Sequence, residues 1–482
     1  IGTTAARIGT INIGSATNAG NLTTIAGDLI FADQINITGG DLANGTEDSK
    51  LTAAASVTST NGILLTKGIG DAELEITAAA TITGVIDGAG TGAGNSLIDV
   101  REAVTFASSI GNTGTVDLMT VLDAKTATFT GSTINVASIL LAGDSGTMTF
   151  SGSTIAQTIT GIIEGATAGS GVINLNNTGG IMKFVSAVGQ ADAPVKAITI
   201  ADATSVDFNS TVFTETLTIN QATAGDFTRV GAKDNLIGTV GGNAGALVFA
   251  TGTKIQLGSG IVAGDVVFDV QTATAGVGGV VVNGDMTVAL PSNFTSGTIT
   301  LIDGDFDATT AAEVADILAP STALVDYTVA GDGGATNDVT ITANLKSSSA
   351  IGAGLGVSAE KALSFTQLLS ATTTGGDTAL MDAITDGLNA TNGGSLATVT
   401  TLVEQASPQT DTTSGSVGAA MSATNNVQSI MDNRMASLRS GDAYVTGMSA
   451  GDGISAKSGF IQAFGSDIEQ KNRTKGTSTN FG

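Results

Sequence analysis

The feature that most limits what this chain can fold into is an internal repeat. The stretch TATFTGSTI begins at Thr126, and a near copy, TMTFSGSTI, begins at Thr147. Phenylalanine recurs in similar strand-like contexts in two series, at steps of 23 and 21 residues (Phe106, Phe129, Phe150) and at steps of 19, 22 and 19 residues (Phe208, Phe227, Phe249, Phe268). A loose period of about 20 residues, built from short β-rich pieces, is typical of a solenoid.

The composition distinguishes between kinds of solenoid. The sequence shows neither a leucine-rich pattern nor a helical repeat of about 33 residues. Small and β-branched residues suit short strands, and 66 glycines are available for turns with positive φ. We therefore predict an all-β fold in which residues 1–296 form a right-handed parallel β-helix with three short strands per coil. The alternative is a pair of β-sandwiches with fortuitous repeats.

Longer strands follow the repeat and predict a C-terminal cap over residues 297–345. Residues 325–342, VDYTVAGDGGATNDVTIT, are typical of a hairpin with a Gly, Asp and Asn turn. A helical pattern, AAEVADIL, lies at 311–318. A solenoid needs such a cap because its last coil otherwise presents an unpaired strand edge.

The pattern then becomes helical. Apolar residues at spacings of three and four predict helices at 358–369, 377–388, 395–406 and 425–441. Residues 458–473 alternate instead, as an amphipathic β-strand does. We expect no second strand in the segment that follows, TKGTSTNFG.

Charge and composition exclude several classes of function. The net charge of −25 argues against nucleic-acid binding, which needs clustered Lys and Arg. The chain has no cysteine, so it has neither disulfides nor cysteine metal sites. We expect no cofactor, although acidic Gly-rich turns leave adventitious Ca²⁺ binding open, and no metal ligand is assigned.

The sequence offers little catalytic chemistry. GDSG at 143–146 resembles a serine-protease signature, but a chain without histidine cannot form a Ser-His-Asp triad. Asp303, Asp305 and Asp307 have the spacing of a calcium loop, which fails further on because Ala308 and Val314 replace the required Gly and Glu.

Paired carboxylates such as Glu73 and Glu75 can hydrolyse glycans on a β-helix. Aromatic residues to stack sugars are few, at 4%, and nothing in the sequence singles out one pair. An enzyme would need a groove with clustered acids, Arg and aromatic residues at adjacent coils, and no such cluster is visible, because the 18 Lys and Arg residues are spread along the whole chain. We therefore predict a protein that is not an enzyme and assign no catalytic or cofactor-binding residue.

Four segments, taken in order, resemble bacterial type V autotransporters. GTITLIDGDFD (297–307) is similar to a passenger-cap strand, and LVEQASPQT (402–410) is similar to the Leu-rich linker of that family. MDNRMASLR (431–439) resembles the helix that threads the barrel pore. GFIQAFGSDIEQKNR (459–473) resembles the first strand of the outer-membrane barrel.

This resemblance implies a domain order for the chain. A β-helical passenger (1–296) is followed by its cap (297–345), a helical linker (346–424), a pore-type helix (425–441) and the start of a truncated outer-membrane β-barrel (442–482). The partners of the strand at 458–473 would then lie beyond Gly482.

The resemblance also implies a location and a class of function. The expected place is the cell surface, outside the outer membrane of a Gram-negative bacterium, with attachment to that membrane through a downstream barrel. The expected function is that of a non-enzymatic adhesin or of a structural protein that forms a surface layer or filament. Its partners would be ligands on host or neighbouring cells, or copies of itself. The alternative is a β-helical enzyme that acts on polysaccharides at the cell surface.

Overall fold

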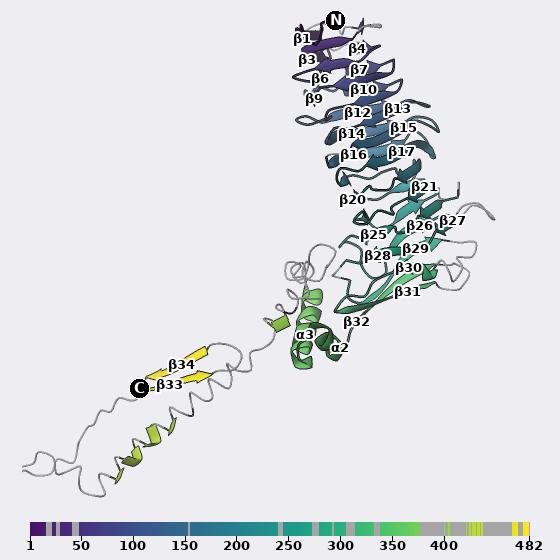
Figure 1. Cartoon of the computed structure of the whole chain (residues 1–482). Helices are drawn as coiled ribbons and strands as arrows, with labels where there is room; N and C mark the ends of the chain where they lie inside the picture. The colour runs from purple at the N-terminus through teal and green to yellow at the C-terminus, as the bar shows by residue number, and fades with distance from the viewer. Residues whose placement is uncertain are drawn as a thin grey trace, which may run out of the picture.

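A computed structural model shows an all-β chain whose stacked parallel strands form a β-solenoid (Figure 1). This result confirms the predicted parallel β-helix, while its right-handed sense stays a prediction. The structure describes residues 1–15, 22–25, 29–40, 48–152, 155–239, 244–271, 279–291, 294–304, 314–331, 338–375, 400, 403–404, 421, 424–425, 427–429, 431–433, 435–436, 465–470 and 476–481.

Two large sheets contain the described strands of the solenoid and its cap. The 13-stranded sheet contains β2 (Leu22–Ile25), β4 (Ser49–Ala53), β7 (Ala72–Ile76), β10 (Ser96–Val100), β12 (Val116–Val121), β14 (Thr133–Leu141), β16 (Gln157–Gly165), β18 (Met182–Phe184), β20 (Val206–Phe208), β22 (Thr228–Val230), β25 (Lys254–Leu257), β28 (Met286–Ala289) and β30 (Ile317–Leu318). The 19-stranded sheet contains β1 (Ile8–Gly14), β3 (Ile30–Thr38), β5 (Val57–Ser59), β6 (Ile63–Thr66), β8 (Ala80–Thr83), β9 (Ile86–Ala89), β11 (Val104–Phe106), β13 (Thr126–Phe129), β15 (Thr147–Gly152), β17 (Ser170–Asn177), β19 (Val195–Ile200), β21 (Phe213–Ile219), β23 (Asn235–Ile237), β24 (Ala246–Phe249), β26 (Val266–Val270), β27 (Gly279–Val282), β29 (Gly297–Gly304), β31 (Val325–Gly331) and β32 (Val339–Leu345).

The register of the strands shows how long each coil is. Leu51, Leu74, Ile98, Met119 and Ile139 occupy one row, each aligned with the next by parallel pairing. The longest step along this row runs from Leu74 to Ile98, and the shortest runs from Met119 to Ile139. The coil length therefore varies more than the near copies in the sequence suggest, because turns between strands differ in length.

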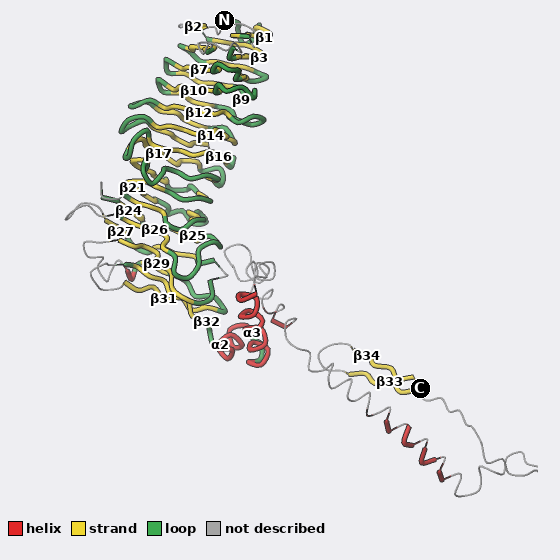
Figure 2. Tube along the Cα trace, turned by 180° about the vertical axis from the view of Figure 1, so that it is seen from behind, coloured by secondary structure: helices red, strands yellow, loops and turns green. Residues whose placement is uncertain are grey.

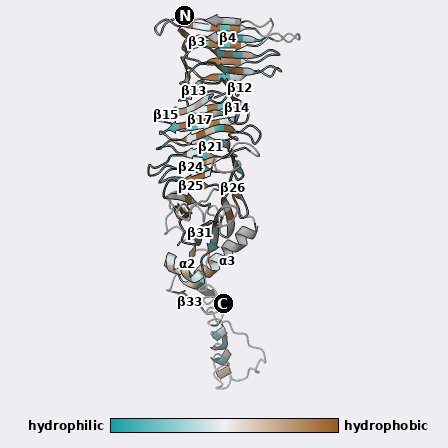
Figure 3. Ribbon diagram, turned by 90° about the vertical axis from the view of Figure 1, so that its right-hand side faces the viewer, coloured by the Kyte–Doolittle hydropathy of each residue, from teal (hydrophilic) through white to brown (hydrophobic). Residues whose placement is uncertain are grey.

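Alternation along most strands separates the core from the surface. In β7, Ala72, Leu74 and Ile76 are buried inside the solenoid, while Glu73 and Glu75 project from its outer side. Successive coils repeat this pattern, so that apolar residues recur along the strands of the stack (Figure 3). Burial of this continuous apolar row is the main force that holds one coil on the next.

Phenylalanine rings form a column inside the solenoid. The ring centroids of Phe106 and Phe129 lie 5.3 Å apart, and those of Phe129 and Phe150 also lie 5.3 Å apart. All three rings are fully buried. Phe184 and Phe208 of β18 and β20 stack at 5.1 Å, and the rings of Phe150 and Phe184 meet edge-on at 5.7 Å, so the column of rings passes from one sheet to the other.

Strand direction reverses at the end of the stack. β29 pairs in parallel with β26 but antiparallel with β32, and β31 pairs antiparallel with β32. The hairpin predicted for 325–342 is therefore confirmed. The helical pattern predicted for 311–318 is wrong at its end, because Ile317 and Leu318 form β30, which pairs in parallel with β28.

Two helices follow the hairpin (Figure 2). α2 (Ser348–Leu355) begins after Ser347, whose side chain accepts a hydrogen bond from the Ala350 amide, and it ends at Gly356 with a φ of 68°. α3 (Ala359–Gly375) confirms the helix predicted for 358–369. Buried side chains of both helices belong to the same apolar cluster as the cap, namely Ile351, Leu355, Ala362 and Phe365.

The other helix predictions lie wholly or partly outside the described residues. The segment 377–388 lies outside them. Residues 400 and 403–404 are helical within the segment 395–406, and several described residues between 425 and 436 are helical as well. No helix in the part of the chain that the structure describes is long and apolar enough to span a membrane.

The expectation of a lone strand near the end of the chain is wrong. β33 (Gly465–Gln470) pairs antiparallel with β34 (Gly476–Phe481), from Gly465 opposite Phe481 to Gln470 opposite Gly476. The segment GTSTNF lacks aliphatic residues, yet its β-branched threonines favour extended backbone. Residues 458–464 lie outside the described residues.

Candidate functional site

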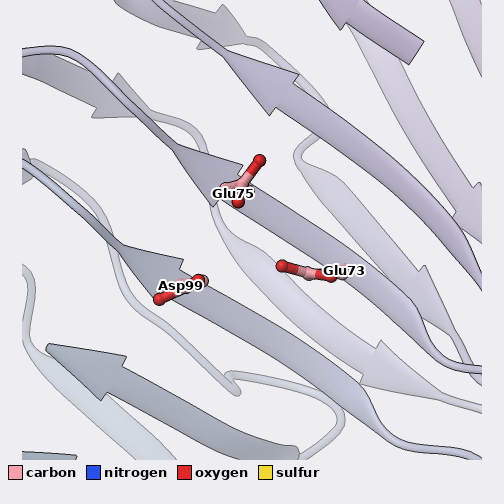
Figure 4. Close-up of side chains that lie close together, drawn as sticks. All are labelled: Glu73, Glu75 and Asp99. Atoms are coloured by element: carbon pink, nitrogen blue, oxygen red, sulfur yellow. The ribbon is translucent and has the colours of Figure 1, made fainter. Parts of the chain in front are cut away.

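A cluster of charged side chains lies on the outer side of three adjacent coils. We call Lys50, Glu73, Glu75, Asp99 and Arg101 the charged cluster. Parallel pairing aligns Lys50 of β4 with Glu73 of β7, and it aligns Glu75 of β7 with Asp99 of β10. Outward positions of successive coils thus bring together residues that are far apart in the sequence, and Figure 4 shows the three carboxylates side by side.

Ion pairs connect every member of the charged cluster. Lys50 Nζ lies 3.0 Å from Glu73 Oε1 and 3.4 Å from Glu75 Oε1. Arg101 Nε lies 2.7 Å from Glu75 Oε1 and 2.8 Å from Asp99 Oδ2. The hydroxyl of Thr52 donates a hydrogen bond of 2.8 Å to Glu75 Oε2. Two cations therefore serve three carboxylates, and the cluster keeps one formal negative charge.

The environment moves the pKa values of the two glutamates in opposite directions. Burial raises the pKa of Glu73, although Lys50 acts to lower it. Burial also acts to raise the pKa of Glu75, but the Thr52 hydrogen bond and the charges of Lys50 and Arg101 hold it below its usual range. Neighbouring carboxylates with separated pKa values are the arrangement that acid–base catalysis requires.

The donor atoms of the charged cluster show how well it would bind a metal ion. Glu73, Glu75 and Asp99 each offer a carboxylate oxygen, and these oxygens lie within 4.8 Å of one another. The buried Oδ1 atom of Asp99 has no hydrogen-bond partner among the described residues. However, Ca²⁺ takes six to eight oxygen ligands, and here Lys50 and Arg101 already contact the carboxylates. The residues present therefore fit a charge network better than a calcium site.

The sequence did not reveal this cluster. The structure brings acids together with Lys50 and Arg101 but without an aromatic residue, and the steps from Lys50 to Glu73 and from Glu75 to Asp99 each span one coil. Both steps are longer than the one between the near copies at Thr126 and Thr147, so a fixed period would place the charges out of register. No aromatic residue occupies the outward positions aligned with the cluster on β4, β7 and β10.

Many of the other acidic residues connect one coil to the next. The carboxylate of Asp71 accepts a hydrogen bond from the Asn95 amide, and that of Asp123 accepts one from the Ser145 amide. Asp202 accepts hydrogen bonds of 2.8 Å from the amides of Ala222 and Thr223. These bonds lower the pKa of Asp202 to about 2. A substantial part of the negative charge is therefore structural.

The remaining candidates from the sequence are turn or strand residues. In GDSG, the Ser145 hydroxyl donates to Asp123 in a turn, and the Asp144 side chain is 82% exposed. Asp303 lies on β29 opposite Asp269 of β26, and burial followed by the charges of Asp338 and Asp269 raises its pKa. Asp305 and Asp307 lie outside the described residues.

Comparisons with known proteins give no relative from which a function could be transferred. No family model, no curated protein and no solved structure matches the chain.

Proposed function

We propose that this chain is the rod-shaped passenger of an autotransporter-type protein and that it acts without catalysis. It works as an adhesin or as a structural protein of a surface layer or filament, outside the outer membrane of a Gram-negative bacterium. Its partners are ligands on host or neighbouring cells, or other copies of the rod. A barrel of the autotransporter type is its proposed partner in the outer membrane.

The observation that carries this proposal is that polar side chains along the stack bond to residues of neighbouring coils. Each carboxylate of the charged cluster contacts Lys50 or Arg101, and turn carboxylates such as that of Asp202 accept backbone hydrogen bonds from the next coil. These groups support a stiff, regular rod. A rod of this kind presents long flat faces, and such faces suit binding or lateral packing more than they suit chemistry.

Localisation and binding test this proposal separately. An antibody against the solenoid should label intact cells of the source bacterium, and its epitope should be sensitive to external protease. Purified protein should then bind cells or matrix, or assemble into ordered arrays in electron micrographs. Labelling that requires permeabilised cells would exclude surface display, and a protein that neither binds nor assembles would exclude both structural roles.

The charged cluster favours a second candidate, an enzyme that acts on polysaccharides. Glu73, whose pKa is raised by burial, would donate a proton to a glycosidic oxygen, and Glu75 would act as the ionised partner. A panel of neutral and acidic polysaccharides tests this function by the release of reducing ends. Activity that is lost in Glu73→Gln and kept in Glu102→Gln would establish it, because Glu102 pairs with Lys125 outside the cluster.

A further inference from the structure

One long face of the solenoid presents two rows of outward side chains that are almost all uncharged. We call this surface the threonine face and define it by the outward positions of β8, β11, β13, β15, β17, β19, β21 and β24. Register pairs join the first row from coil to coil: Thr81, Thr105, Thr128, Thr149, Asn174, Thr199, Thr218 and Val248. The second row consists of Thr126, Thr147, Val172, Ala197, Thr216 and Ala246.

Five hydroxyl groups in the first row of this face are available to a partner. Thr105, Thr128, Thr149, Thr199 and Thr218 are partly exposed, and their hydroxyls hydrogen-bond to no other residue that the structure describes. Elsewhere on the solenoid, by contrast, many polar side chains bond to the neighbouring coil, as Thr52 does to Glu75. In the second row the Thr147 hydroxyl donates a hydrogen bond of 2.9 Å to the Ser145 carbonyl, and Lys196 pairs with Asp144, so the available hydroxyls are those of the first row.

Charge is distributed very unevenly around the rod. The eight strands of the threonine face contain only two ionisable residues, Lys196 and Glu215. Another face carries the charged cluster, and a third carries Lys183, Asp207 and Arg229 in one row. The chain as a whole has a net charge of −25, so two copies repel each other in most orientations. The threonine face is where two copies can approach with the least repulsion.

The dimensions of the face agree with a weak contact between copies. Eight strands at about 4.8 Å make a surface about 35 Å long, and four residues per strand make it about 13 Å wide. Each partner would bury about 450 Å², or about 900 Å² in total, which is slightly below the ~1,000 Å² expected of a specific interface. Short side chains allow two flat sheets to pack closely, as in interfaces between stacked sheets.

We propose that the threonine face is the surface through which two copies of this chain pack side by side. This inference rests on the proposed function and specifies how its assembly form would work. The contact is weak between two free molecules and becomes significant where many rods are held close together, because tethering raises their effective concentration.

Sedimentation velocity of the whole chain between about 1 and 200 µM tests the inference. The wild type should show reversible association that strengthens as NaCl rises from about 50 to about 500 mM, because salt screens the repulsion between acidic rods. The variant T128D/T149D places like charges opposite each other and should weaken association about tenfold or more. T133D/T158D is the matched control, because Thr133 of β14 and Thr158 of β16 are also aligned outward residues of successive coils, on another face, and the change adds the same two charges.

Each outcome of this experiment has a clear meaning. A wild-type chain that stays monomeric at both salt concentrations overturns the inference, as does association that weakens with salt. Equal effects of T128D/T149D and T133D/T158D overturn it too, provided that circular dichroism shows all variants folded. A monomeric chain that still binds cells would leave the adhesin form of the proposed function intact, so the two failures are distinguishable.

Discussion

Truncation of Phe129 tests whether the phenylalanine column holds adjacent coils together. The Phe129 ring is fully buried, with ring centroids 5.3 Å away on both sides, those of Phe106 and Phe150. A buried Phe→Ala change costs about 3–5 kcal/mol, and each ring pair contributes about 0.5–1.5 kcal/mol beyond area burial. Because Phe129→Ala removes two such pairs, we expect it to lower the free energy of unfolding by about 5 kcal/mol, near the upper limit.

Phe249→Ala is the matched control for this prediction. Phe249 is also fully buried, but among the described rings it has one neighbour, Phe268, in an edge-on arrangement at 6.4 Å. Both substitutions remove the same number of atoms, but Phe249→Ala removes less ring stacking than Phe129→Ala does. We therefore expect a loss of about 3–4 kcal/mol, which is at least ~1 kcal/mol smaller than that of Phe129→Ala.

Native-state hydrogen exchange is the appropriate assay, because long repeat arrays do not always unfold in a single transition. A loss of about 5 kcal/mol corresponds to exchange that is faster by between three and four powers of ten, at about 1.4 kcal/mol for each tenfold change. The acceleration should be centred on β11, β13 and β15. An effect of Phe129→Ala no larger than that of Phe249→Ala would refute the reasoning that the column adds stability beyond burial.

Asp202, Lys50 and Gly161 each allow a further prediction. The pKa of Asp202 falls from its ordinary 3.8 to about 2 in the folded chain, so its stabilisation is complete above pH 3.8 and is lost as the pH falls towards 2. The melting temperature should therefore drop over this window, and Asp202→Asn should make the drop shallower; an unchanged profile would contradict the role of this carboxylate. Lys50→Met should lower the melting temperature at pH 7, because Glu73 loses a partner at 3.0 Å, and should cost less as the pH falls towards the raised pKa of Glu73, because protonation removes the unpaired charge. A cost that does not depend on pH would show that Lys50 acts through packing alone. Gly161→Ala should destabilise the chain by about 3 kcal/mol or more, because Gly161 has a φ of 110° and its added Cβ would overlap the carbonyl oxygen of Val136. Gly354→Ala in α2 is the control and should stabilise by up to about 1 kcal/mol, since no described atom lies near its Cβ.

The solenoid could be predicted from the sequence because repeated local patterns set it. The near copies at Thr126 and Thr147 do lie side by side, with Phe129 opposite Phe150 as their similarity suggests. The hairpin of β31 and β32 was equally predictable, because Gly, Asp and Asn mark its turn. Both features depend on neighbours in sequence or on one repeat step.

The charged cluster could not be predicted, because it depends on the sum of several turn lengths. An error of one residue in a coil would exchange which residues face outward, and a larger error would move Glu75 away from Asp99. α2 was missed for a different reason, since SSAIGAGL contains two serines and two glycines with low helix propensity. Its only local signal was the capping residue Ser347.

The coil step has a mechanical consequence. If a force pulls on one end of the rod, the outermost coil is held only by its neighbour and should peel away by itself. A coil such as the one between Leu74 and Ile98 would release about 80 Å of extended chain while the rod shortens by only about 4.8 Å. The protein would then behave as an extensible tether that dissipates load one coil at a time, with most of its length still folded.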